Sequence, residues 1–193
     1  MKKLFALFIF SIITLITFAQ NESEHLTFKG VPIDGTLRQY VDKMKNQSFE
    51  FIEEDDNTAI LQGDFAGYKD CNITVSTLKS MDLVHQIVVE FPSRNKWKLV
   101  KMDYEKLKSM LTEKYGKPSK ITEKFLGDIP SSDIEIETKL LSDEYTWFSI
   151  FDVPKGQIQL HIKYQLLRGC YIALAYLDEI NTKSIRSHAI IDL

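Results

Sequence analysis

The feature that most constrains this chain is the order of its predicted elements, in which a helix and four strands occur twice. Apolar residues recur at helical spacing from Leu37 to Met44 and again, more clearly, from Val100 to Tyr115. Four segments with strand-like alternation follow each helix, and the residues from about Asn181 onward indicate a terminal helix. The sequence therefore predicts an α+β protein of two similar units that pack together. Each unit is a helix with a four-stranded antiparallel sheet, and a C-terminal helix follows the second.

The predicted strands lie at 26–28, 49–51, 59–65, 71–75, 83–91, 121–126, 145–153, 158–164 and 170–177. Aligning the two helices gives an internal repeat of about 70 residues. The number of residues between matching elements of the two units then grows toward the C-terminus, because the second unit holds an acidic insertion at 127–142. We interpret this insertion as a surface loop with a short helical turn. The predicted units are 20–97 and 98–193, or they form one continuous domain. A rival alignment superposes Cys71 on Cys170 but does not match the helices.

The first nineteen residues have the layout of a secretory signal peptide. Lys2 and Lys3 precede an apolar run at 4–18, and the small residue Ala19 predicts cleavage before Gln20. As a helix this run would reach about 22 Å, short of the roughly 30 Å hydrocarbon core, which disfavours the alternative of a membrane anchor. No cysteine stands near the cleavage region, so we expect no lipid anchor. We therefore leave 1–19 out of the fold and expect the mature protein to be secreted or periplasmic.

The expected mature chain is mildly acidic, because without Lys2 and Lys3 it has 22 basic residues against 27 acidic ones. Such a charge gives no reason to bind nucleic acid or anionic lipid. The glycines form no phosphate-binding loop, and the sequence has no G-x-S-x-G or H-E-x-x-H motif. We therefore expect a protein without a cofactor that binds no nucleic acid and, after cleavage, no membrane.

The two cysteines, Cys71 and Cys170, leave two alternatives open. An even number of cysteines outside the cytoplasm favours a disulfide. Both residues, however, lie on apolar faces of predicted strands, beside Ile73 and Ile172, where a free thiol packs as a small hydrophobic side chain. The sequence does not give the close Cα approach that a disulfide requires.

No constellation of residues predicts a reaction. The acidic run from Glu53 to Asn57 fits either a calcium site or a hairpin turn, and its spacing favours the turn. The four histidines lack paired metal spacing, so no metal site is predicted. His85 is the one candidate general base, whereas His161 is expected to point to solvent. As a nucleophile and its base, Cys71 and His85 lack the third member of a catalytic triad. The alternative function is an extracytoplasmic hydrolase with a site between the two units.

Two predicted strands of the second half are apolar on both faces. In the first of them, Trp147 and Phe151 lie on one row, with Phe148 and Ile150 on the other. The second face must be covered by the terminal helix, by the insertion or by another molecule. We predict a protein or peptide partner at Phe148, Ile150 and Tyr171, or a second copy of the chain. The predicted function is therefore non-catalytic binding of an extracytoplasmic partner.

Paired helix-plus-four-strand units on a secreted chain of this length resemble the β-lactamase-inhibitor-protein-like fold, in which two α+β repeats lay their sheets side by side. The run FKGVPIDGT…LQGDFAGYKDC…YEKLKSMLTEKYGKP, which covers most of the mature chain, is similar to small secreted bacterial proteins of uncharacterised function. These resemblances imply a tandem α+β architecture and a bacterial secreted protein. They imply no inhibitory residue, because no matching motif is present.

Overall fold

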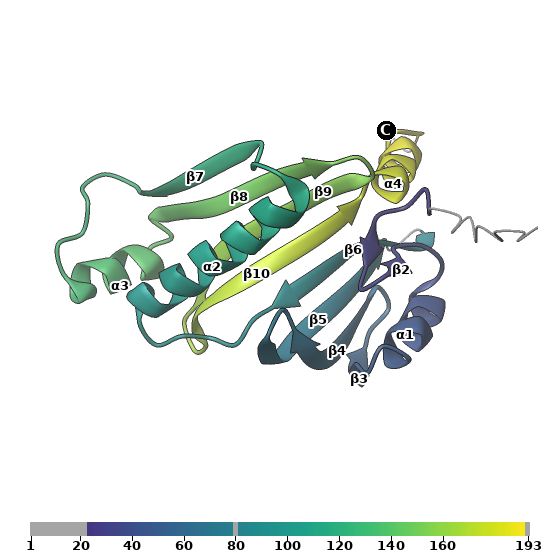
Figure 1. Ribbon diagram of the computed structural model, residues 1–193, viewed down its shortest axis with the longest axis horizontal. Helices are drawn as coiled ribbons and strands as arrows, with labels where there is room; N and C mark the ends of the chain where they lie inside the picture. The colour runs from purple at the N-terminus through teal and green to yellow at the C-terminus, as the bar shows by residue number, and fades with distance from the viewer. Residues whose placement is uncertain (1–22, 79–80, 192–193) are drawn as a thin grey trace, which may run out of the picture.

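The structure is a computed structural model that describes residues 23–78 and 81–191, so the predicted signal peptide at 1–19 lies outside the described residues (Figure 1). In chain order the elements are β1 (Thr27–Phe28), β2 (Val31–Pro32), α1 (Leu37–Lys45), β3 (Glu50–Glu54), β4 (Thr58–Phe65), β5 (Tyr68–Leu78), β6 (Met81–Glu90), α2 (Trp97–Tyr115), β7 (Lys120–Phe125), α3 (Asp133–Leu141), β8 (Tyr145–Val153), β9 (Gly156–Gln165), β10 (Gly169–Asp178) and α4 (Glu179–Ile191). They form a two-stranded and an eight-stranded sheet. This confirms the predicted α+β class and the C-terminal helix.

The large sheet takes four strands from each half of the chain, in the order β3-β4-β5-β6-β10-β9-β8-β7 (Figure 1). The last strand of each half meets at the centre, where Ile87 of β6 is opposite Tyr176 of β10 and Val89 is opposite Leu174. The edges of the sheet are β3 and β7. The sheet is thus continuous across the two halves, and buried apolar side chains from both halves belong to one hydrophobic cluster.

Helices α1 and α2 cover one face of this sheet. The first begins with a capping box, in which the Thr36 hydroxyl accepts from the Gln39 N–H and the Gln39 side chain accepts from the Thr36 N–H. The buried stripes are Leu37, Tyr40, Val41 and Met44 in α1, and Val100, Tyr104, Leu107 and Leu111 in α2. These are the positions that the helical spacing predicts. After α2, Gly116 has a φ of 87°, a left-handed conformation that suits glycine.

Three predicted boundaries are corrected by the structure. The strand expected at 26–28 is β1, and it pairs with a second two-residue strand, β2, which the sequence did not indicate. The insertion at 127–142 contains the nine-residue helix α3, because Ser132 caps its first turn and Leu140 is buried against the body of the protein. The terminal helix begins at Glu179, directly after β10, rather than at about Asn181.

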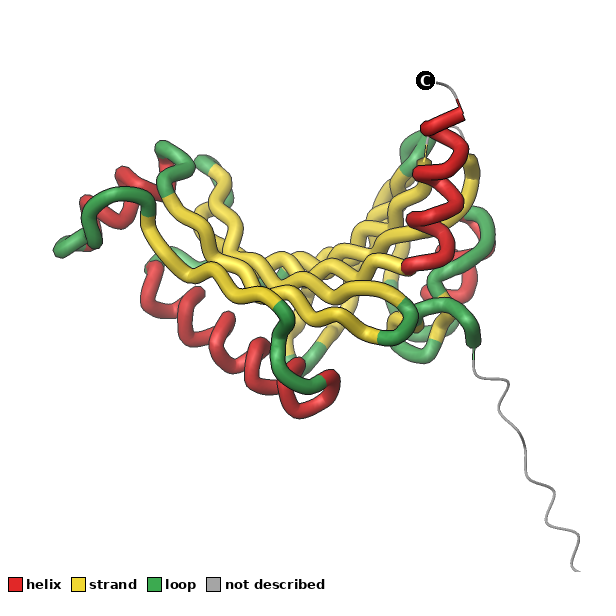
Figure 2. Tube along the Cα trace, turned by 90° about the horizontal axis from the view of Figure 1, so that it is seen from above, coloured by secondary structure: helices red, strands yellow, loops and turns green. Residues whose placement is uncertain are grey.

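The large sheet is curved into a trough, as Figure 2 shows. Helices α1 and α2 lie on the convex side, and α4 rises on the concave side at one end of the trough. Most of the concave side therefore carries no helix. Among the residues described, no helix has both the length and the apolar character that a bilayer span requires.

Candidate functional site

The candidate site is the concave face of the large sheet, which we call the open face. On β8, Ser149 points toward α2, because its hydroxyl lies 2.7 Å from the Tyr104 hydroxyl. Trp147 and Phe151 share that side and are buried. Since successive strand residues point to opposite faces, Phe148 and Ile150 belong to the open face.

Strand register extends this assignment across the whole sheet, because directly opposed residues of antiparallel strands share a face. One row across the open face is Thr122, Phe148, His161, Ala173, Glu90, Asn72, Gln62 and Glu50. The next row is Lys120, Ile150, Gln159, Ala175, Val88, Thr74, Ile60 and Glu53. The open face is therefore a mixture of apolar, amide and charged side chains.

The three residues predicted to bind a partner all lie on the open face and are half-buried. Phe148 packs on the His161 ring, with centroids 5.5 Å apart, and the Lys120 ammonium lies 5.4 Å from its centroid. Ile150 is its neighbour on β8. Tyr171 lies apart from these two, since it is opposite Lys163 and the guanidinium of Arg168 lies 3.8 Å from its ring centroid. Phe148 and Ile150 thus form a contiguous apolar pair on the open face, and Tyr171 lies outside that pair, beside Arg168 and Lys163.

The second faces of the two apolar strands do not form one continuous apolar surface. The two apolar strands, β8 and β10, are separated by β9, whose open-face side chains are all polar. On β10, Ala173 and Ala175 are only 8% exposed, and they lie between the longer side chains of β9 on one side and β6 on the other. The polar alternation of β9 is visible in the sequence, but its position between the two apolar strands depends on the strand order.

A chain of side-chain hydrogen bonds runs along β9. The Asp152 carboxylate accepts from the Gln157 amide at 2.9 Å, Gln157 accepts from Gln159 at 2.5 Å, and Gln159 Oε1 lies 3.2 Å from His161 Nε2. Burial, with a smaller effect from the Lys163 charge, lowers the pKa of His161 to about 4. The ring is thus neutral at neutral pH, and the network assigns the proton to Nε2. Strand alternation alone indicated a solvent position for His161, so this polar chain was missed.

One end of the trough is formed by α4, which packs mainly on β6 and also contacts β9 and β10. A pocket of about 420 Å³ lies at its base, lined by Asp152, Gln157, Leu177, Thr182 and Lys183 among others. Through Asp152 and Gln157 the pocket joins the polar chain of β9. The helix therefore covers only the end of the open face.

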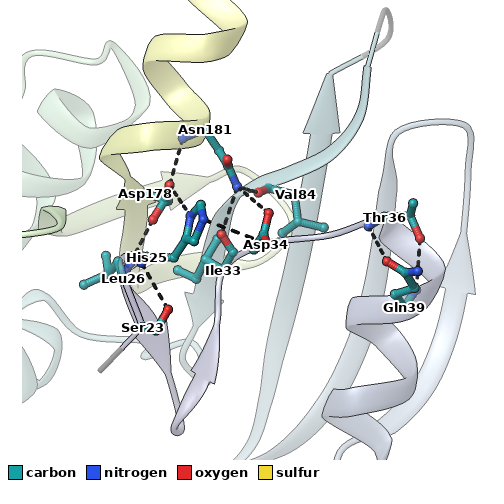
Figure 3. Close-up of polar contacts among 10 residues, drawn as sticks. All are labelled: Ser23, His25, Leu26, Ile33, Asp34, Thr36, Gln39, Val84, Asp178 and Asn181. Carbon is teal, nitrogen blue, oxygen red and sulfur yellow. Dashed lines mark hydrogen bonds and ion pairs between the residues drawn. The ribbon is translucent and has the colours of Figure 1, made fainter. Parts of the chain in front are cut away.

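A buried polar cluster attaches α4 to the start of the described chain (Figure 3). Asp178 is fully buried, and its two carboxylate oxygens accept separately from the backbone N–H groups of Leu26 and Asn181, both at 2.8 Å. His25 Nδ1 donates to the same carboxylate at 3.1 Å. The Asn181 side chain donates to two backbone carbonyls, those of Ile33 at 3.0 Å and Val84 at 2.8 Å. We call His25, Leu26, Asp178 and Asn181 the Asp178 cluster.

The structure does not bring His85 and Cys71 together. His85 lies one residue beyond Gln86, which is opposite Ser76, so more than five residues of β5, or more than about 17 Å, separate it from Cys71 along the strand. Burial lowers the pKa of His85, and its buried Nδ1 has no hydrogen-bond partner among the described residues.

Both cysteines are buried free thiols. They sit on β5 and β10, and β6 lies between these strands. Two strand spacings amount to about 9.6 Å, which exceeds the Cα separation of about 7 Å that a disulfide tolerates. Burial is the main cause that raises the pKa of each thiol to about 11. Of the two alternatives left open by the sequence, the geometry favours the free thiols.

The acidic run at 53–57 ends β3 and forms the turn into β4. The Asp55 carboxylate accepts from the N–H groups of Asn57 and Thr58 and from the Thr58 hydroxyl. These hydrogen bonds lower the pKa of Asp55. The run therefore performs the local turn role that its composition indicates, and no cluster of potential metal ligands is found in the described ranges.

Comparisons with protein-family models, with curated proteins and with solved structures found no match to this chain. The site is thus defined by its own geometry. What the open face offers is a curved surface with an apolar pair, a polar chain and exposed charges, an arrangement suited to recognition of a complementary surface.

Proposed function

We propose that this protein acts by non-catalytic binding, through the open face, of a protein or peptide that it meets outside the cytoplasm. The observation that carries the proposal is the concave eight-stranded sheet, which α1 and α2 leave uncovered and α4 covers only at one end. Phe148 and Ile150 provide an apolar contact at the centre of the second half, and the amides of β9 provide hydrogen-bonding groups. A half-buried aromatic residue surrounded by polar side chains is a common centre of binding energy in interfaces.

We also propose that the two halves are similar units in a β-lactamase-inhibitor-protein-like tandem arrangement, exported by cleavage of 1–19. Strand order supports the first point, because β3 to β6 and β7 to β10 run from opposite edges toward the centre. In each half a helix precedes the four strands. The hydrolase alternative has no such support, since no observation on the described residues places a carboxylate beside His85.

Site-specific photo-crosslinking in the extracytoplasmic fraction tests the binding function. A photo-reactive residue at Gln159 samples the open face, and one at Met110, which is exposed on α2, samples the convex side. We expect a discrete adduct from Gln159 alone. Phe148→Ser should abolish it, whereas Leu99→Ser, which removes an exposed side chain from α2, should not.

The variants are first compared by circular dichroism to establish that they fold. Equal adducts from Gln159 and Met110, or no adduct from Gln159, would contradict the proposal. An adduct that consists of two copies of the chain would replace the hetero-partner with a homodimer.

A further inference from the structure

Three lysines gather on the open face near the β7 edge. Lys120 is opposite Ile150, Lys124 is opposite Thr146 and Lys163 is opposite Tyr171, so all three side chains share the face of Phe148. All three are exposed, and none forms an ion pair with another described residue. The β7 side of the trough therefore carries net positive charge, because on this face three lysines stand against the carboxylate of Asp152.

The opposite side of the trough carries negative charge. Glu50 and Glu53 of β3 are opposite Gln62 and Ile60, and both are exposed on the open face. Between the β3 side and the β7 side, the charges of Arg168 and Glu90 neutralise each other in an ion pair. Seven strand spacings separate β3 from β7, about 34 Å along the sheet. This distance is several Debye lengths at physiological ionic strength, so the charges on the β3 side and the β7 side do not neutralise each other.

We propose that the partner of the open face is a protein with a convex, charge-segregated surface, acidic where it meets Lys120, Lys124 and Lys163 and basic where it meets Glu50 and Glu53. This inference rests on the proposed binding function and names the chemistry of the partner. The curvature of the trough calls for a convex occupant, and the charges fix its orientation. A second copy would present a trough that is also concave. A nucleic acid would be repelled at the glutamate end because its charge is uniformly negative.

Charge-reversal variants measure the contribution of the lysines. The test variant is Lys120→Glu/Lys124→Glu/Lys163→Glu. The matched control is Lys98→Glu/Lys114→Glu/Lys117→Glu, which changes the net charge equally at exposed positions in or just after α2. Because Lys120 contacts the Phe148 ring, the double variant Lys124→Glu/Lys163→Glu is included in case the triple variant does not fold.

The probe is fluorescently labelled poly-L-glutamate of about twenty residues, and binding is followed by anisotropy and by amide shifts in NMR spectra. The test variant should bind it at least about tenfold more weakly than the wild type, and the control less than about twofold more weakly. In the wild type, the shifts should centre on β7 and β9. Equal losses in both triple variants, or shifts centred elsewhere, would overturn the inference, because binding would then follow net charge alone.

The same triple variants, crosslinked at Gln159, separate this inference from the proposed function. A partner retained equally by the test and control variants refutes the charge complementarity while the binding function stands. An open face that yields no adduct in the wild type refutes the binding function, whatever the polyglutamate result.

Discussion

Replacing Asp178 by asparagine tests whether the Asp178 cluster holds α4 at the end of the trough. The change preserves the size of the side chain and the ability to cap the first turn of α4. It removes the negative charge, however, and turns one of two accepting oxygens into a donor. In the wild type these oxygens accept separately, Oδ2 from the Leu26 N–H and Oδ1 from the Asn181 N–H.

The magnitude follows from the number of donors left without an acceptor. Whichever way the substituted amide turns, its single oxygen can serve only one of the two backbone N–H groups. A buried N–H without an acceptor costs about 1–3 kcal/mol. Loss of the charged acceptor for His25 Nδ1 adds about 1 kcal/mol, the difference between a hydrogen bond to a charged group and one to a neutral group. We expect Asp178→Asn to lower the free energy of unfolding by about 2–4 kcal/mol.

Urea unfolding followed by circular dichroism measures this change, with the m-value checked for equality between variants. The matched control is Asp152→Asn, because Asp152 is exposed and also accepts a side-chain hydrogen bond. It should change the free energy of unfolding by less than about 0.5 kcal/mol. A loss below about 0.5 kcal/mol for Asp178→Asn, or equal losses in both variants, would refute the reasoning.

Three further predictions concern the pH dependence, the thiols and one turn. Folding lowers the pKa of His161 from 6.5 to about 4. Between pH 6.5 and pH 4, His161 therefore takes up a proton in the unfolded chain but not in the folded chain. Stability should therefore fall from pH 6.5 to 4, and His161→Gln should remove about 1–2 kcal/mol of that fall, allowing for screening of a half-exposed ring. Maleimide titration without reductant should label Cys71 and Cys170 in denaturant but neither at neutral pH in the native protein, since burial raises the pKa of both thiols to about 11. Finally, Gly156→Ala should destabilise the protein by more than about 2 kcal/mol in urea unfolding, because the new Cβ would lie 2.0 Å from the Leu177 carbonyl oxygen at a φ of 155°.

Each of these outcomes has a result that contradicts it. A pH profile identical in wild type and His161→Gln would show that another group titrates. Fewer than two labelled thiols per denatured chain would show a disulfide. A Gly156→Ala variant as stable as Gly67→Ala, where the glycine also has positive φ but no atom within 4 Å, would show that the close approach to Leu177 is relieved at no cost.

Local periodicity in the sequence was sufficient for the helices and for the faces of most strands. The stripe from Val100 to Leu111 is buried as a helix of 3.6 residues per turn requires. The alternation of β5 buries Cys71, Ile73 and Val75 on one face. Such patterns follow from backbone geometry within a few residues, so no knowledge of distant partners is needed. The extent of α3 was underestimated as a short helical turn, because its apolar residues fit a strand as well as a helix.

The candidate site depended on long-range pairing that the sequence does not contain in local form. No signal near Asp178 indicates that Leu26, 152 residues earlier, donates to it and buries it. Which strands become neighbours is likewise decided by the packing of the whole core. The sequence by itself determined that Phe148, Ile150 and Tyr171 do not share a row with the residues facing the core, because alternation is a property of each strand. Only the tertiary structure decided that β9 separates β8 from β10 and that the lysines and glutamates collect on opposite sides of one trough. Strand order and sheet curvature arise from contacts between segments far apart in the chain, so they cannot be derived from local patterns.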